Sequence, residues 1–318
     1  MRYLYFISRL AVLLVMILAS SCARVPATPV STETTLPTSI PLPTETAVPS
    51  PTTPPTKEPT QKEFEDFNPN KFDQSTSIDN KWLPLKPGTQ WSYDGFTVVN
   101  GAKIPHRLVV TVTDLTKVIN GVNSVVTWDQ DFKADQLTEG ELAFFAQDKN
   151  GTVWRMGEHP EAYEDGTFIE APTWFTGIED AKAGIEMQAA PQLGTPSYSE
   201  GWGPSVDFTD RGKVSQMGQM VCVPSDCYND VLVIDETSKA EPGAHQLKYF
   251  ASNVGNIRVA WTGADQTQET LELIKVVQLT PDAMVDVSAK ALELEKHAYL
   301  VSKDVYGLTP PSQPAAGD

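Results

Sequence analysis

The chain has 318 residues, with 24 Lys and Arg against 41 Asp and Glu, and its formal net charge at pH 7 is −17. Phosphate backbones and anionic lipid headgroups repel a surface of this sign, so nucleic acid is excluded as an expected partner. The acidity could attract cations, but solubility outside the cell explains it more simply.

The first 21 residues have the parts of a secretory signal. Arg2 and Arg9 precede nine uncharged apolar residues, Leu10–Leu18, and the small residues Ala19–Ser21 lead directly to Cys22. This ending resembles the lipobox of bacterial lipoproteins, although Ala stands where Leu is usual. We expect cleavage before the cysteine, and acyl chains that together hold the protein on a membrane. The alternatives are an ordinary signal peptide with an incidental Cys, or an uncleaved anchor, which would need about 20 apolar residues.

Residues 22–67 are predicted to form a disordered tether. The segment 23–60 holds ten of the 25 prolines, is rich in Thr and Ser, and has no aromatic residue. Such a composition cannot bury enough apolar surface to offset the entropy lost on ordering. Pro-rich chain favours extended polyproline II, so the tether could reach on the order of 100 Å. Glycosylated hydroxyls and a bare spacer both remain open.

Residues 68–307 are predicted to form one β-rich domain, because β-branched runs alternate there with turn signals. Asn120-Gly121 separates two such runs and predicts a hairpin turn. Asp148 and Asn150 lie in another predicted turn. A calcium loop needs more oxygen ligands than these two supply, so turn formation explains both residues. The Gly- and Pro-rich stretch 172–204 predicts a long ordered excursion with a helical turn near 177–182. The predicted strands are 107–114, 124–129, 141–147, 152–156, 167–170, 213–223, 230–237, 245–251, 256–262 and 267–278.

One helix is expected at the C-terminal end, over residues 280–303. Thr280 provides a cap and Pro281 suits the first helical position, while Asp282 is favourable in the first turn. Apolar residues then recur at steps of three and four, which predicts one stripe packed on a sheet. Gly307 and the prolines after it end the helix, so residues 308–318 are predicted to be a disordered tail. The expected fold is a mainly β, antiparallel meander with a curved or half-barrel-like sheet and this helix packed on it.

Cys222 and Cys227 form an even pair once Cys22 is lipidated, and an oxidising exterior permits a disulfide between them. A redox pair usually has two intervening residues instead of four, and a metal site lacks a third ligand nearby. We therefore expect a local disulfide across a turn, no metal and no cofactor.

The sequence contains no motif that identifies a catalytic, nucleotide-binding or metal-binding site. Of the four histidines, His159 is expected at the surface and His297 on the solvated side of the helix. Most tryptophans should lie in the core, but Trp174, Phe175 and Trp202 fall in the Gly- and Pro-rich excursion. These three are the candidates for lining a ligand groove.

The segment 72–95 resembles the opening of a family of secreted bacterial proteins to which no activity is assigned. The matching positions are Ile78-Asp79-Asn80, Pro84-Leu85, Pro87-Gly88, Trp91, Tyr93 and Gly95. The resemblance continues through 146–154, Gly157-Glu158, 184–187, 230–233, 248–251 and Val254-Gly255, and thus covers nearly the whole domain. It departs at the Cys222–Cys227 turn and at 251–253. The resemblance implies no functional residue, and the motif itself predicts a turn followed by a strand with Trp91 and Tyr93 on one face.

The function expected from the sequence is that of a monomeric, lipid-anchored protein on the outer face of a bacterial membrane, without catalytic residues, that binds or carries an apolar or lipid-like ligand. A structural or adhesive protein of the cell envelope is the alternative, and a hydrolase with an unrecognised site is the third. A deep apolar cavity would favour the carrier, whereas converging carboxylate and His groups in a cleft would favour the enzyme.

Overall fold

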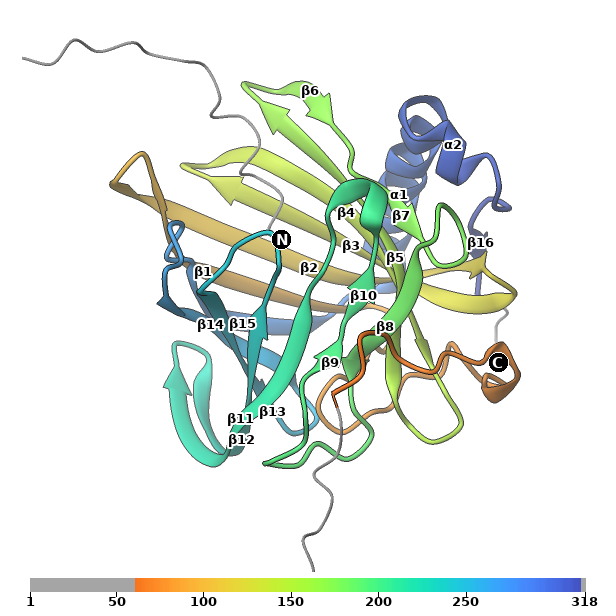
Figure 1. The fold of residues 1–318 in the computed structure, drawn as a ribbon. Coiled ribbons are helices and arrows are strands. Elements are labelled where there is room, and N and C mark those ends of the chain that lie inside the picture. Colours follow the sequence, from red (N-terminus) through yellow and green to blue (C-terminus); the bar gives the residue numbers. More distant parts are fainter. Residues whose placement is uncertain (1–60, 316–318) are drawn as a thin grey trace, which may run out of the picture. The chain divides into compact units, whose positions relative to one another are not determined.

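A computed structural model describes residues 61–315, so the predicted signal peptide, Cys22 and most of the tether lie outside the described part. The described chain is mostly antiparallel sheet with a helix at its C-terminal end (Figure 1). The predicted fold class is therefore confirmed, and each predicted strand overlaps an observed one. Most strands are longer than predicted, because charged and polar residues at their ends continue the hydrogen-bonded pairing. The strand at 167–170 has the predicted bounds, and the last long strand begins at Thr270 instead of residue 267.

The first half of the sheet is a meander in which each strand pairs with the next. Two-residue turns connect most of these strands, and Asn120 and Gly121 adopt positive φ of 47° and 78°, as the hairpin prediction requires. The strands of this half are β1 (Thr89–Val99), β2 (Ala102–Ile119), β3 (Val122–Lys133), β4 (Gln136–Gln147) and β5 (Val153–Glu164).

The second half repeats the meander and joins the first where β15 pairs with β1. At its far hairpin, Cys222 lies opposite Cys227 and the two form the predicted disulfide. The strands of this half are β11 (Arg211–Val223), β12 (Asp226–Thr237), β13 (Ala244–Ala251), β14 (Gly255–Gly263) and β15 (Thr270–Gln278).

The segment between the halves contains short strands that lie at the two ends of the sheet. β10 pairs with β8 at one end and β9 pairs with β11 at the other, and the sheet remains open. The predicted helical turn near 177–182 is wrong: Glu179 and Asp180 have positive φ in a turn that leads into β8. The short strands are β6 (Thr167–Glu170), β7 (Trp174–Phe175), β8 (Lys182–Met187), β9 (Tyr198–Ser199) and β10 (Gly201–Trp202), and 3-10 turns occur at Pro69–Lys71 and Pro204–Val206.

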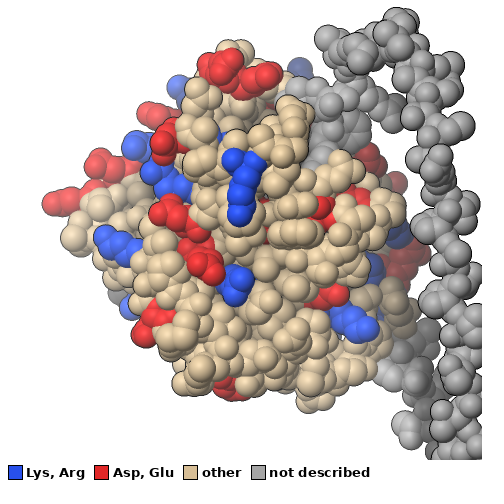
Figure 2. Space-filling view, turned by 90° about the vertical axis from the view of Figure 1, so that its left-hand side faces the viewer, with Lys and Arg blue, Asp and Glu red and all other residues tan. Residues whose placement is uncertain are grey.

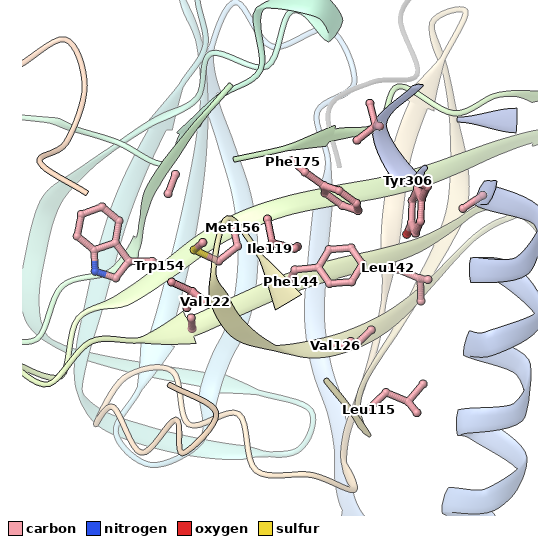
Figure 3. Close-up of a cluster of buried hydrophobic side chains, with 14 of the residues drawn as sticks. Leu115, Ile119, Val122, Val126, Leu142, Phe144, Trp154, Met156, Phe175 and Tyr306 are labelled. Carbon is pink, nitrogen blue, oxygen red and sulfur yellow. The ribbon is translucent and has the colours of Figure 1, made fainter. Parts of the chain in front are cut away.

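One face of the sheet packs against helices α1 (Pro281–Val301) and α2 (Lys303–Tyr306). Thr280 caps α1 by accepting a hydrogen bond from the amide of Ala283, which confirms the predicted helix start. The buried core beneath the helices is made of apolar residues at alternate positions of β2 to β5 (Figure 3). Its largest fully buried members are Ile119, Leu142, Phe144, Met156, Phe175 and Tyr306, and Trp154 packs with them at 5% exposure.

The C-terminal segment is ordered through Ala315, so the predicted disordered tail is wrong for residues 308–315. Strand β16 (Gln313–Pro314) pairs with β2. Before it, the amide and hydroxyl of Ser312 donate to the carboxylate of Glu295, which in turn holds Lys117 at 2.8 Å. The Lys117 side chain is 0% exposed, and its ammonium also donates to the carbonyl of Pro310 at 2.7 Å. A buried ion pair therefore joins the sheet, the helix and the last residues.

The described chain also begins earlier than the predicted domain start at residue 68. Phe64 stacks 5.3 Å from Trp202 and Phe67 lies 5.6 Å from Trp154 between ring centroids. The residues 61–67 thus pack on the sheet, since these two aromatic rings supply apolar area that the Pro-rich segment lacks.

The segment that carries the family resemblance is structural. Trp91 and Tyr93 point to the same face of β1, as predicted, and donate to the carbonyls of Val254 and Asn256 at 2.7 and 2.8 Å. These bonds attach β1 to β14 and to the turn before it, across β15. Asp148 likewise has a structural role. Its carboxylate accepts hydrogen bonds from the amides of Asn150 and Thr152 and so stabilises the turn.

Candidate functional site

A cleft of about 440 Å³ opens between helix α1 and strands β3 to β5. Its walls combine apolar side chains with a carboxylate and an imidazole. The lining residues are Trp128, Gln130, Leu137, Gly140, Glu161, Tyr163, Lys290, Glu293, Leu294 and His297.

Strand alternation and helix periodicity together position these residues. His159, Glu161 and Tyr163 occupy alternate positions of β5, and the first two lie opposite Leu142 and Gly140 of β4, so they face the helix. On α1, the lining residues recur at intervals of three and four, which places them on one side of the helix. The cleft is thus formed where an amphipathic helix covers the polar end of a mainly apolar strand face.

The buried carboxylate of Glu161 is the centre of the polar wall. It accepts hydrogen bonds from His297 Nδ1 at 2.8 Å, His159 Nε2 at 3.0 Å and the Tyr163 hydroxyl at 2.6 Å. Burial raises the pKa of Glu161, but these three donors outweigh it and the net pKa is lowered. The carboxylate is therefore ionised at neutral pH, and its negative charge is held at the edge of the cleft by a half-exposed His297.

His159 is fully buried behind this carboxylate, which overturns the prediction of a surface histidine. Burial lowers the pKa of His159, so the ring is neutral near pH 7. Since Glu161 can only accept, His159 donates from Nε2 and its Nδ1 accepts from the Thr173 hydroxyl at 2.6 Å. Thr173 lies 2.8 Å from the hydroxyl of Ser302 in a second hollow of about 370 Å³ near the end of α1.

The chemistry available in the main cleft is binding or water activation. His297 Nδ1 is directed at the Glu161 carboxylate at 2.8 Å and leaves Nε2 free of it, which is the arrangement of a His–carboxylate general base. No Ser, Thr or Cys lines this cleft, and the Tyr163 hydroxyl already donates to Glu161. The lining therefore offers no serine, threonine or cysteine nucleophile, whereas a hydrogen-bonded ligand or a water molecule is compatible with the geometry.

The opposite face of the sheet carries buried charged groups among its apolar side chains, and the Arg155 guanidinium lies 5.2 Å from the Phe145 ring. Arg155 contacts Glu158 at 2.6 Å and Glu186 at 2.9 Å, and Lys248 contacts Glu236 at 2.7 Å. Burial raises the pKa of Glu158 to about 7 despite the nearby guanidinium. Burial lowers the pKa of Lys248 on β13, but Glu236 and Glu186 of β8 outweigh it and the net pKa is raised. An apolar ligand would have to displace or cover these charges, at a large desolvation cost.

The structure separates the three aromatic residues predicted to line a groove. Trp174 and Phe175 are 1% and 0% exposed and belong to the core: Trp174 stacks on Phe208, and Phe175 packs on Phe144. Neither lines an open groove: β7 pairs with β5, its two side chains point to opposite faces, and each is covered on its own face. Trp202 is partly exposed and contacts Phe64. None of the three belongs to the cleft under α1.

Sequence reasoning missed the residues that do line the cleft. Glu161, and His159 behind it, had one usable signal, namely polar residues at alternate positions of a β-rich segment. His297 recurs with Leu294 and Lys290 on the helix, but nothing in the sequence places that side of the helix beside β5. In the described residues, His106, Asp131 and Glu269 form a further cluster, the one group of three potential metal ligands.

Comparisons with known proteins give little guidance. No protein-family model and no curated protein matches the chain, so the resemblance of the segment 72–95 stays a prediction. One similar solved structure is assigned as an exported protein with a YmcC-like fold, from Bacteroides fragilis NCTC 9343. It is 12% identical, covers 62% of this chain and 99% of its own, and has a TM-score of 0.35.

A second similar structure is assigned as a lipoprotein from Parabacteroides distasonis ATCC 8503. It is 10% identical, covers 63% of this chain and 100% of its own, and has a TM-score of 0.34. At these TM-scores the likeness carries no argument about this chain. Within residues 61–315, no helix is long and apolar enough to cross a membrane.

Proposed function

We propose that the chain is a lipid-anchored, extracytoplasmic binding protein whose cleft under α1 receives a small polar ligand with an apolar face, such as a saccharide unit. The lipobox-like end of the signal and Cys22 support the proposed lipid anchor. The Pro- and Thr-rich tether that follows supports the extracytoplasmic location. The disulfide between Cys222 and Cys227 supports an oxidising compartment.

The observation that carries the binding proposal is the mixed lining of the cleft. Trp128, Leu137 and Leu294 supply apolar surface, while Gln130, Glu161 and His297 supply hydrogen-bonding groups. A ring with an apolar face and hydroxyls at its edge matches both kinds of wall, and the volume of about 440 Å³ is within the range of small-ligand sites. A lipid tail would leave the buried Glu161 charge facing hydrocarbon, which is unfavourable.

The charged interior of the sheet supports this revision of the ligand class. The lipid-like ligand expected from the sequence needed an apolar concavity, and Arg155 and Lys248 with their carboxylate partners occupy that face. We therefore assign the ligand to the helix-covered side.

The binding proposal is tested at Gly140, which lies on the floor of the cleft. A Cβ atom there would meet Tyr163 and Leu294 at 3.7 and 3.8 Å, which is ordinary contact, so Gly140→Ala fits. Gly140→Leu would extend into the cleft and occupy it. Saturation-transfer NMR of the full chain with a panel of monosaccharides and N-acetylated amino sugars measures binding.

We expect a signal for at least one sugar with the parent protein and with Gly140→Ala, and its loss with Gly140→Leu. No signal with any sugar, or equal signals from both variants, would refute the saccharide proposal. Anionic lipid vesicles serve as the competing probe. If the parent protein binds them and Gly140→Leu does not, the ligand of the cleft is a lipid.

Hydrolysis is the second candidate, favoured by the hydrogen bond between Glu161 and His297. In that case His297 would activate a water molecule beside the ligand. His297→Gln should then abolish turnover of a bound substrate while weakening its binding by no more than the loss of one hydrogen bond, whereas a pure binding protein shows no turnover in either form.

The anchor is tested separately with Cys22→Ala. The variant should appear in the medium or remain unprocessed, and a normally processed, membrane-bound variant would refute lipidation.

A further inference from the structure

Three side chains from distant parts of the sequence converge on the face of the sheet opposite α1. His106 lies on β2 and Asp131 on β3, and Glu269 directly precedes β15. They are 2%, 5% and 7% exposed, and one ligand atom from each lies within 4.8 Å of the other two. The cluster is thus buried and lies apart from the cleft under α1.

Asp131 fixes the orientation of the imidazole. Its carboxylate is 2.6 Å from His106 Nε2, and its other oxygen accepts from the Thr138 hydroxyl at 3.1 Å. Because an ionised carboxylate only accepts, the hydrogen on His106 is drawn to Nε2 and the lone pair of the neutral ring lies on Nδ1. Carboxylates play this role behind many metal-binding histidines, where they fix the tautomer and make the ligand nitrogen more basic.

His106 Nδ1 is buried and has no hydrogen-bond partner. It faces Glu269 Oε1 at 3.4 Å, and the second oxygen of Glu269 is held by the amide of Gln246. Two ligand atoms bound tetrahedrally at about 2.0–2.1 Å from one zinc ion lie about 3.3–3.4 Å apart. The two atoms therefore already have the spacing of neighbouring ligands.

We propose that His106 Nδ1 and Glu269 bind a divalent transition-metal ion, with Asp131 as the residue that positions the imidazole. An imidazole with a carboxylate suits Zn²⁺, whereas Mg²⁺ and Ca²⁺ prefer oxygen ligands throughout. This site goes beyond the binding of a small ligand proposed above and is independent of it.

The proposal is tested with the full chain, purified in detergent, stripped with a chelator and titrated with Zn²⁺ against a chromogenic indicator. We expect one zinc ion per chain that a tenfold excess of Mg²⁺ does not displace. His106→Gln and Glu269→Gln should each abolish binding. Asp131→Asn should weaken it 10- to 100-fold, as expected for a group that acts through the ligand.

The matched control is His245→Gln. His245 also pairs with a carboxylate on a neighbouring strand, at 2.8 Å from Asp235, but it is not part of the three-residue cluster. Its substitution should leave the zinc stoichiometry unchanged.

X-ray absorption at the zinc edge is measured on the parent protein, so it needs no variant, which could fail to fold. It should show one imidazole, oxygen ligands and no sulfur. Absence of zinc binding, unchanged stoichiometry in His106→Gln, or a spectrum with two imidazoles or a sulfur ligand would each overturn the proposal.

Discussion

The buried ion pair between Lys117 and Glu295 should be a major determinant of stability, and Lys117→Met tests it. The Lys117 ammonium donates to Glu295 at 2.8 Å, to the Tyr299 hydroxyl at 3.2 Å and to the carbonyl of Pro310 at 2.7 Å. The ring of Tyr306 lies 4.7 Å from it. Burial lowers the pKa of Lys117 even though Glu295 opposes this, so the ammonium depends on these partners for its charged state.

Removing the cation leaves Glu295 buried with only the two donors of Ser312. Breaking a buried pair in this way costs about 3–5 kcal/mol. For a domain of this size each kcal/mol lowers the melting temperature by about 2–4 °C, so Lys117→Met should melt roughly 6–20 °C lower. Urea unfolding followed by tryptophan fluorescence measures the free energy.

Two further variants separate the pair from general loss of packing. Lys117→Met combined with Glu295→Gln removes both charges and should recover more than half of the lost stability, because no unpaired charge remains. Lys62→Met removes a lysine paired with Asp66 at 2.5 Å on the surface, where the side chains are 55% and 84% exposed; it should have no measurable effect. A loss below 1 kcal/mol in Lys117→Met, or no recovery in the double variant, would refute the reasoning.

Three other outcomes are expected. Burial lowers the pKa of His159 in the folded state, so below about pH 6.5 the unfolded state binds a proton that the folded state does not, and acidification favours unfolding. The unfolding free energy should therefore fall more steeply from pH 7 to 5.5 in the parent protein than in His159→Gln. Parallel slopes would contradict this. Replacing Cys222 and Cys227 by serine should cost about 2 kcal/mol in urea unfolding, since the closed loop is short; a loss above 4 kcal/mol would mean that the bond does more than close the hairpin. Ser312→Ala removes the hydroxyl donor to Glu295 at 2.8 Å and should cost about 1.5–3 kcal/mol, the range for a hydrogen bond to a charged group, with an unchanged melting temperature as the opposing result.

The strands, turns and helix could be predicted because their signals are local. Asn120-Gly121 tolerates positive φ at both positions and so favours a two-residue hairpin turn. The Thr280-Pro281 cap with its apolar stripe defines a helix without knowledge of its neighbours. The Cys222–Cys227 disulfide was predictable for the same reason, since the two residues lie five positions apart.

The candidate sites could not be predicted, because each depends on pairings between distant segments. Glu161 and His297 are 136 residues apart and meet only after the helix packs on the sheet. Lys117 resembles a surface lysine in sequence, and its burial depends on Glu295 and on the carbonyl of Pro310. Trp174 and Phe175 lie in a segment with loop-like composition, yet two residues of strand pairing turn them into the core.

The pairing of β1 with β15 has a consequence for the order of folding. Trp91 lies opposite Val276, so the first long strand receives its second neighbour only after nearly the whole domain has emerged during synthesis. The ion pair under α1 is completed later still, by Pro310 and Ser312. Contacts of such sequence separation make folding slow. The core under α1 therefore stays incomplete until residues 310–312 have been synthesised, although the local hairpins of β2 to β5 can pair well before then.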